Sequence, residues 1–340
     1  MISIDIVRDV REIKSEWEQI YSLGYLSPFQ SFEAQLIYQT HFYNYYRRWP
    51  LRAMYVVARS EDNIMILPIT VCVLRRRVAD YFYGSTVDYF DVLIGKKDTF
   101  LFNYVIQFLS HKFPGYQILF GRVHQNSILH ELLSEEDIAI QEKCVSISIG
   151  KEYEEYYHRL SAHQRQNIRT SYNRIAKENI HVELRQFPHI SHKLWHQCYR
   201  MYERRAMVHR GGHDSFFKAC RIGLLIFSLR WRNLVNLMIR KTASFYILFF
   251  NDIPVAFMAG FFSNDGAVYY VPRLSANDDW AFYSPGIILV NETAKMLINS
   301  EVSVIDLTAG DEKYKYLMGG ITHMRYTYSL NQSRYDIQNH

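Results

Sequence analysis

The sequence predicts a protein of the α+β class built from two halves. Its 340 residues favour two domains over one, and 49% hydrophobic against 21% charged residues allow a full core. Helical periodicity opens each half and strand-like runs follow it, which is typical of helices packed on a sheet. We expect the first half at residues 1–150, the second at residues 151–330 and a tail at residues 331–340.

The first half begins with two helical segments. Apolar residues recur at helical spacing in Val10–Leu23 and again in Ser31–Arg48, and Ser27-Pro28 separates the two segments. The other elements expected in this half are a strand pair at Met54–Ala58 and Ile64–Leu74, a helix at Thr99–Lys112, and strands at Tyr116–Phe120 and Cys144–Ile149.

The second half also begins with helices. Lys151–Leu160 has helical spacing, and Ser161-x-x-Gln164 forms a capping box at the start of the next helix. The elements expected after it are a strand at His181–Gln186, a helix at Ser191–Arg205, and strands at Leu234–Lys241, Ser244–Phe250 and Val255–Phe262.

A strand, a helix and a second strand then follow in close succession. Ala267–Val271 has the valine and tyrosine content of a strand, and Ser284-Pro285-Gly286 opens a helix in which Ser284 is expected to cap an orphan N–H group. Val302–Leu307 is the second strand and contains Asp306. Two strands joined by a helix predict a parallel crossover.

Polar side chains collect where this crossover ends. A helix N-terminus favours an anion, and Asp306, Asp311, Glu312, Tyr314 and Lys315 follow directly from the second strand. A phosphate-friendly helix start beside acid, phenol and amine groups suits transfer from a phosphate-bearing carrier. An ordinary buried crossover with a solvated acidic loop would show the same spacing.

Two arginines form a second candidate. Arg165 and Arg169 lie one helical turn apart and share a face. Arginine binds phosphate and carboxylate bidentately, so the pair can clamp an anionic substrate. A solvated basic face is the alternative interpretation.

Several classes of protein are excluded by what the sequence lacks. It contains no G-x-G-x-x-G, P-loop, H-E-x-x-H or G-x-S-x-G motif, which argues against dinucleotide redox chemistry, nucleotide hydrolysis, zinc proteolysis and serine esterase chemistry. A net charge of +5 is too low for a dedicated nucleic-acid binder. The four scattered cysteines, and the lack of an apolar run long enough for a signal peptide or a membrane span, favour a cytoplasmic protein without a metal site.

Two segments resemble the CelD/FemAB-like acyltransferases of the GNAT superfamily, the acetyltransferase domains of cellulose and exopolysaccharide biosynthesis. The runs SPGIIL and VIDLTAGDEKYKYLMGG are similar to the C-terminal signature of that family, and SAHQRQNIRTSYNRI is similar to its Ser-x-x-x-Arg-x-Asn-x-Arg helix. The residues that carry the resemblance are Ser284, Pro285, Gly286, Asp306, Gly310, Asp311, Tyr314 and Lys315, with Ser161, Arg165, Asn167 and Arg169 upstream.

The resemblance implies a tandem GNAT-like (acyl-CoA N-acyltransferase) fold, with two mixed-sheet halves sharing a cleft. It implies transfer of an acyl group, with acetyl-CoA as the expected donor, to an amine or hydroxyl of a sugar or cell-envelope precursor. A Fem-type transferase that uses aminoacyl-tRNA is the first alternative, and only there is a nucleic acid expected as partner. The second is a non-catalytic scaffold in polysaccharide synthesis.

The same resemblance implies roles for individual residues. Tyr283, Ser284 and Gly286 would bind the acyl-CoA donor, and Arg165 and Arg169 would bind the acceptor. The catalytic candidates are Asp306 or Asp311 as the base and Tyr283, Tyr314 or Lys315 as the donor to the developing oxyanion. The segment Trp280–Gly286 reproduces only the last glycine of the usual GNAT pyrophosphate loop, Arg/Gln-x-x-Gly-x-Gly/Ala.

Overall fold

The computed structural model of the chain describes residues 2–24, 26–46, 51–80, 88–209, 236 and 238–335. The chain divides into two compact units, Met1–Lys143 with His323–His340, and Cys144–Thr322. Residues 323–330, which the sequence analysis assigns to the second half, thus belong to the first unit, and residues 336–340 of the expected tail lie outside the described part.

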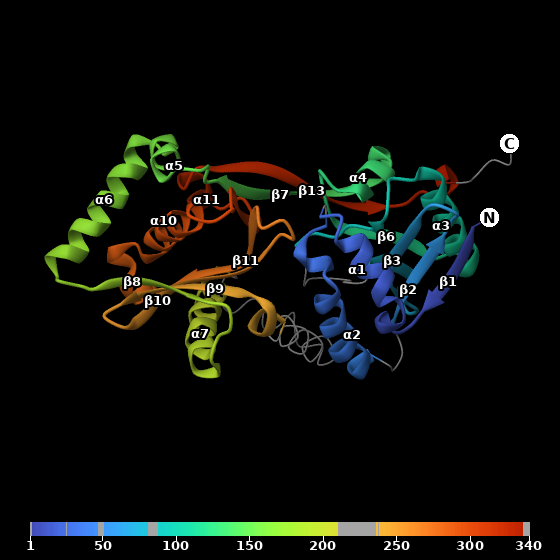
Figure 1. Cartoon of the computed structure of the whole chain (residues 1–340), viewed down its shortest axis with the longest axis horizontal. Coiled ribbons are helices and arrows are strands. Elements are labelled where there is room, and N and C mark those ends of the chain that lie inside the picture. The colour runs from blue at the N-terminus through green and yellow to red at the C-terminus, as the bar shows by residue number, and fades with distance from the viewer. Residues whose placement is uncertain are drawn as a thin grey trace. The chain divides into compact units, whose positions relative to one another are not determined.

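The first unit is a mixed sheet with helices packed on it (Figure 1). Its strands follow the order β1-β2-β3-β4-β6-β13, and β4 pairs with β6 in parallel. Its elements up to β7 are β1 (Ser3–Val7), α1 (Lys14–Tyr21), α2 (Phe32–Tyr46), β2 (Leu51–Arg59), β3 (Ile64–Cys72), β4 (Arg77–Asp80), β5 (Leu93–Ile94), α3 (Thr99–Lys112), β6 (Gln117–His124), α4 (Ile128–Leu132) and β7 (Ile138–Ser148).

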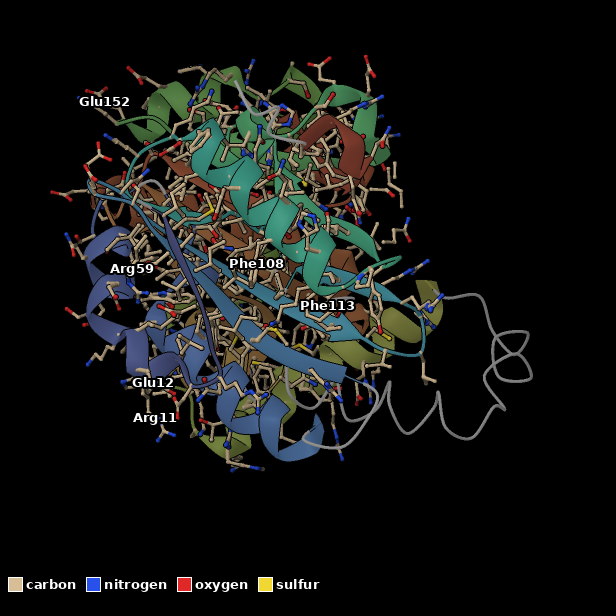
Figure 2. All side chains as sticks on the ribbon, turned by 90° about the vertical axis from the view of Figure 1, so that its right-hand side faces the viewer. Arg11, Glu12, Arg59, Phe108, Phe113 and Glu152 are labelled. Carbon is tan, nitrogen blue, oxygen red and sulfur yellow. The ribbon has the colours of Figure 1, made fainter. Side chains whose placement is uncertain are left out.

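Aromatic packing and ion pairs attach the helices of this unit to its sheet. Trp17 of α1 is buried edge-on against Tyr55 of β2, with ring centroids 5.8 Å apart. Arg59, at the end of β2, pairs with Asp5 and Glu16. Figure 2 shows the position of Arg59 and shows α3 running across the unit. The helices expected over residues 10–23, 31–48 and 99–112 and the strand pair at residues 54–74 are therefore confirmed.

The second unit is a mixed sheet with helices on both faces (Figure 1). Its strands follow the order β7-β12-β11-β10-β9-β8, in which β11 and β12 are parallel and the other pairs antiparallel. Its elements are α5 (Tyr153–Arg159), α6 (Ala162–Lys177), β8 (Val182–Phe187), α7 (His192–His209), β9 (Ser244–Phe250), β10 (Ile253–Phe262), β11 (Val268–Ala276), α10 (Pro285–Ile298), β12 (Val304–Ala309), α11 (Lys313–Leu317) and β13 (Gly320–Ser329).

Successive side chains of β9 and β10 point to opposite faces of the sheet, so the core of this unit has one part on each face. Leu248 and Met258 pack with α6 and α10 on one face. Phe249 and Phe257, next to them in sequence, pack with Cys198 and Met201 of α7 on the other. Because neighbouring strand residues point to opposite faces, α10 and α7 cover opposite sides of the sheet.

A polar network attaches α5 and α6 to α10. Tyr153 donates from its hydroxyl to Asn291 Oδ1 at 2.8 Å, and Asn291 Nδ2 donates to the Tyr172 hydroxyl at 3.2 Å. Glu292 accepts from Tyr172 and pairs with Lys295. Since Asn291 is fully buried, these bonds satisfy polar groups that would otherwise be costly to bury.

The boundaries of the two units fall within β7 and β13, each of which has residues in both units. Both units contain parallel as well as antiparallel strand pairs, and the α+β class is confirmed. The sequence analysis did not recognise β13, which alternates aromatic with polar residues.

One expected strand is wrong. Residues 238–242 are helical, although the run Leu234–Lys241 was interpreted as a strand and residues 234, 235 and 237 lie outside the described part. Ala243 N–H donates to Ile239 O, and the Thr242 hydroxyl donates to Met238 O, both bonds of helical spacing. A short apolar run does not distinguish a buried helix end from a strand.

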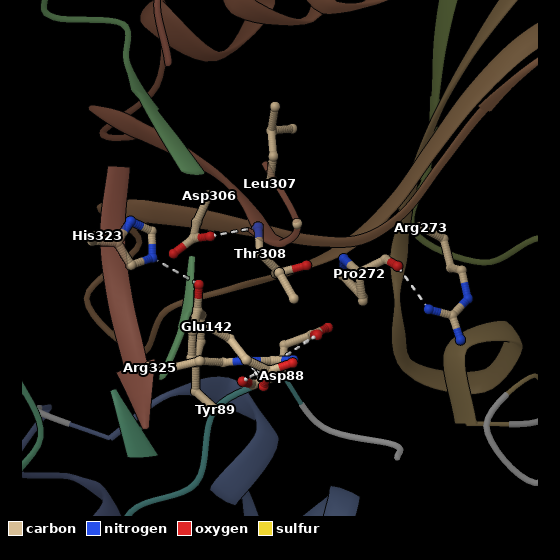
Figure 3. A network of polar contacts seen from close by, with 12 residues as sticks. Asp88, Tyr89, Glu142, Pro272, Arg273, Asp306, Leu307, Thr308, His323 and Arg325 are labelled. Atoms are coloured by element: carbon tan, nitrogen blue, oxygen red, sulfur yellow. Dashed lines mark hydrogen bonds and ion pairs between the residues drawn. The ribbon is translucent and has the colours of Figure 1, made fainter. Parts of the chain in front are cut away.

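A histidine and tyrosine cluster lies in the first unit (Figure 3). The Tyr89 hydroxyl and His323 Nε2 are 2.9 Å apart, and the His124 ring centroid is 4.9 Å from those of both Tyr89 and His323. Asn126 N–H donates to His124 Nδ1, which requires that nitrogen to be unprotonated. Burial, with the nearby His323 and His130, lowers the pKa of His124 to about 4.

His124 predicts a loss of stability in mild acid. As the pH falls from 6.5 toward 4, an unfolded histidine binds a proton that folded His124 does not, so the free energy of unfolding drops by up to about 3 kcal/mol. Urea unfolding at a series of pH values should show a shallower pH dependence for His124→Gln than for the wild type. His158→Gln, at an exposed position on α5, should keep the wild-type dependence. If the free energy of unfolding depended equally on pH in the wild type and in His124→Gln, the loss of stability in mild acid could not be assigned to His124.

Candidate functional site

The site begins where two parallel strands separate. β11 and β12 pair from Val268 with Val304 as far as Tyr270 with Asp306. Beyond that pair β11 continues to Ala276 along β10, while β12 continues to Ala309 along β7. The facing edges of the two strands are therefore no longer bonded to each other.

A bulge turns β11 at this point. Ala259 of β10 faces Arg273 and Phe261 faces Tyr270, so Val271 and Pro272 together oppose the single residue Gly260. A Cβ at Gly260 would lie 2.2 Å from the carbonyl oxygen of Tyr270, so only glycine permits this approach. Bulges bend the strand that carries them and are common beside active sites.

β12 bulges immediately after the same pair. Asp306 faces Ser146 of β7 and Ala309 faces Cys144, which leaves two residues of β12 opposite one of β7. Thr308 has φ of 53°, a rare value for a β-branched residue, and its N–H donates to Asp306 Oδ1 at 2.7 Å (Figure 3). Asp306 is buried, and its carboxylate holds the strained backbone.

The ammonium group of Lys315 holds the rest of this bulge. Its side chain is 3% exposed, and Nζ lies 2.7–3.4 Å from four successive carbonyl oxygens, those of residues 307–310. Glu312 adds a carboxylate oxygen at 3.1 Å. Three N–H groups are thus shared among five acceptors, and we propose a positioning role for Lys315; its direct contact with an oxyanion stays a prediction from the sequence.

The other catalytic candidates lie in the loop and short helix after β12. Asp311 is exposed, and Tyr314 is partly buried in the first turn of α11, where it packs on the core of the second unit. Gly310, with φ of 105°, makes the turn between the bulge and Asp311. Asp306, Asp311, Tyr314 and Lys315 thus belong to one continuous segment at the end of β12.

The start of α10 follows β11 through a short 3-10 segment, Asp278–Tyr283. Ser284 adopts a left-handed conformation, φ 52°, and its side chain caps no N–H, contrary to expectation. Its carbonyl oxygen instead accepts from Ile287 and Ile288. The N–H of Gly286 has no partner in the described part of the chain, and Tyr283 packs on the core of the unit beside it.

The basic residues of α6 have three different environments. Arg165 donates to the carbonyls of His158 and Leu160, which fixes the turn from α5. Arg169 is exposed and donates to Gln166 on its own helix. Arg174 donates to Phe282 O at 2.7 Å and stacks on the Phe282 ring, so it lies beside the segment that leads into α10. The three arginines differ in environment because they point in different directions around α6. Arg174 was not among the candidate site residues that the sequence predicts.

Residues 162–316 match the family described as the acetyltransferase (GNAT) domain. A search of curated proteins found no match to the sequence. The matched span runs from α6 to α11 and contains both bulges and the start of α10.

Solved structures show the same fold at low sequence identity. FemX is 10% identical, with a TM-score of 0.58, and the match covers 95% of this chain and 97% of that one. A conserved protein of unknown function from Bacteroides thetaiotaomicron VPI-5482 is 14% identical, with a TM-score of 0.55, over 97% and 100%. The C-terminal domain of a putative lysylphosphatidylglycerol synthetase from Agrobacterium fabrum is 10% identical, with a TM-score of 0.50, over 96% and 94%.

The fold is GNAT-like. The chain is an acyltransferase, as the family match indicates. Within the described residues no group of three or more histidine, cysteine or acidic side chains is placed to hold a metal ion. No described helix has both the length and the apolar character needed to cross a bilayer.

Replacement of Lys315 tests its positioning role. Lys315→Met should lower the free energy of unfolding by about 2–4 kcal/mol, because buried carbonyls lose their shared donor. Lys313→Met, at an exposed position of the same short helix, should leave the free energy of unfolding nearly unchanged. Urea unfolding of both variants provides the measurement. Wild-type stability of Lys315→Met together with a turnover reduced roughly a hundredfold would instead assign Lys315 to the chemistry.

Proposed function

We propose that the protein transfers an acyl group from acyl-CoA, with acetyl-CoA as the simplest donor, to an amine or hydroxyl of a sugar or cell-envelope precursor. The observation that carries the proposal is the separation of β11 and β12 beyond Tyr270 and Asp306. The edge of β11 that no longer bonds to β12 can offer backbone donors and acceptors to an extended, amide-containing arm such as that of CoA, while the carbonyls of residues 307–310 on the β12 side are held by Lys315.

The start of α10 supports phosphate binding beside these edges. Its macrodipole and the unpartnered N–H of Gly286 favour an anion, and Arg174 adds a positive charge next to Phe282. We assign the donor's phosphates to this helix start.

The chemistry then falls to the segment after β12. The acceptor nitrogen or oxygen attacks the thioester carbonyl, the bond from carbon to sulfur breaks, and the thiolate leaves with a proton. We propose Asp311 as the group that takes the acceptor's proton, because Asp306 already holds the backbone of Thr308. We propose Tyr314 as the proton donor to the leaving thiolate, since its phenol lies in the first turn after the loop.

A second candidate is aminoacyl transfer from aminoacyl-tRNA, in the manner of Fem-type enzymes. The likeness to FemX over 95% of the chain favours it. An aminoacyl ester also presents a carbonyl for attack beside phosphates, so the same helix start and strand edges can serve. The two candidate functions differ in the donor substrate, acyl-CoA or aminoacyl-tRNA, and share the same acid–base chemistry.

Thermal unfolding with different donors tests the proposal. A ligand that binds only the folded state stabilises it by about 2.7 kcal/mol at a hundred times its Kd. Acetyl-CoA or a longer acyl-CoA should raise the melting temperature, and deacylated tRNA should not. Stabilisation by tRNA alone would favour the aminoacyl-tRNA candidate, and no stabilisation by any donor would favour a non-catalytic scaffold.

Two arginines of α6 provide a matched pair of variants. Arg174→Gln should raise the KM for acyl-CoA roughly tenfold with little change in kcat, because a charge beside the donor's phosphates is lost. Arg169→Gln, at an exposed position of the same helix whose side chain donates to Gln166, should leave the KM near the wild-type value. Steady-state kinetics with varied acyl-CoA give the measurement, and an equal effect of both substitutions would argue against the assignment of Arg174.

A further inference from the structure

Arg273 is a partly buried arginine without an acidic partner. Its Nη1 donates to the carbonyl of the preceding residue, Pro272, at 2.8 Å (Figure 3). Its Nε is buried and makes no hydrogen bond, and no carboxylate pairs with the group in the described part of the chain. Tyr202 of α7 stacks on the guanidinium, 5.0 Å from ring centroid to the central carbon, which fixes its plane.

Among the described arginines only Arg273 has a buried nitrogen without a hydrogen-bond partner. Arg165 and Arg174 are also partly buried without an acidic partner, but they donate to backbone carbonyls. Three others are neutralised by carboxylates. Arg59 pairs with Asp5 and Glu16, and Arg325 pairs with Asp88 and Glu142. Arg185 also stacks on an aromatic ring, that of Phe249, and it pairs with two carboxylates. A buried N–H group without an acceptor is costly, so the Nε of Arg273 calls for a ligand that supplies one.

The position of Arg273 places it next to the proposed reaction. It follows the bulge at Val271 and Pro272 directly, where β11 leaves β12. It pairs across the sheet with Ala259, which belongs to the core facing α7, so it lies on the face opposite α10. A donor whose phosphates bind at α10 would therefore leave the Arg273 face to the acceptor.

Ser275 provides a second, independent observation on the same face. It is fully buried two residues further along β11, opposite Phe257 of the α7-facing core. Within the part of the chain that the structure describes, its hydroxyl has no hydrogen-bond partner. A cation and a hydroxyl with unsatisfied donors on one face of one strand suit a group that is both anionic and rich in acceptors.

We propose that Arg273, with Ser275, binds an anionic group, carboxylate or phosphate, on the acceptor substrate. This inference rests on the proposed acyl transfer and narrows its acceptor to a negatively charged amine or alcohol. Arg273 thereby becomes a specificity-determining residue, and the acceptor enters from the α7 face.

Anion binding tests the inference without any turnover. The full chain is titrated calorimetrically with inorganic phosphate and with acetate, with and without CoA. The wild type should bind at least one anion in the presence of CoA, and Arg273→Gln should weaken that binding at least tenfold. Arg185→Gln removes a stacked arginine of the same sheet and should bind like the wild type. Arg273→Lys retains the charge and should bind the anion with intermediate affinity. It also provides the test if Arg273→Gln does not fold.

Kinetics with matched acceptors then separate carboxylate from phosphate. With acetyl-CoA as donor, L-alanine is compared with L-alaninamide, and glucosamine 6-phosphate with glucosamine. Arg273→Gln should raise the KM for the charged member of one pair at least tenfold and leave the neutral member unchanged.

Three results would overturn the inference: unchanged anion binding by Arg273→Gln, no anion binding by the wild type, or an equal loss for charged and neutral acceptors. Failure of the proposed function would appear separately, as an absence of stabilisation by any acyl-CoA.

Discussion

The site depends on keeping two parallel strands apart that would otherwise continue to pair. Strand pairing gives backbone N–H and C=O groups their hydrogen-bond partners. Where the two strands separate, these groups therefore need other partners. On β12 the carboxylate of Asp306 and the ammonium of Lys315 supply them, one to an N–H and the other to four carbonyls. On β11 the proline of the bulge has no N–H to satisfy, and Gly260 allows the close approach. Two charged side chains, a proline and a glycine thus replace the hydrogen bonds that β11 and β12 would otherwise make with each other.

The rest of the second unit holds the two sides of this opening in place. The buried network around Asn291 fixes α10, and with it the helix start that follows β11. On the opposite face the apolar contacts of α7 fix Tyr202 against Arg273. The two faces therefore present different chemistry to the same strand edges: the start of α10 on one and, within the described residues, a guanidinium without a carboxylate partner on the other.

The sequence predicts the elements of this site better than their contacts. Pro285 and the spacing around it identify the crossover, and the apolar alternation of β9 and β10 is visible directly. The environment of Lys315 cannot be predicted from the sequence, because contacts with backbone carbonyls do not depend on a pattern of side chains. The neighbouring acids instead suggest an ordinary ion pair. The left-handed Thr308 is equally hidden, since nothing marks a threonine for that conformation. Arg174 and Arg169 differ in helical phase relative to a segment over a hundred residues away, which only the tertiary fold reveals.

The first unit is discontinuous in sequence, and this orders the folding of the chain. Residues Cys144–Thr322 form one uninterrupted span, whereas Met1–Lys143 is completed by His323–His340. During synthesis residues 1–143 emerge first, yet the edge of β6 that pairs with β13 has no partner until the whole of residues 144–322 has followed. An exposed strand edge is a template for wrong pairing, so the interval before β13 arrives is the period in which the nascent protein is most prone to aggregate.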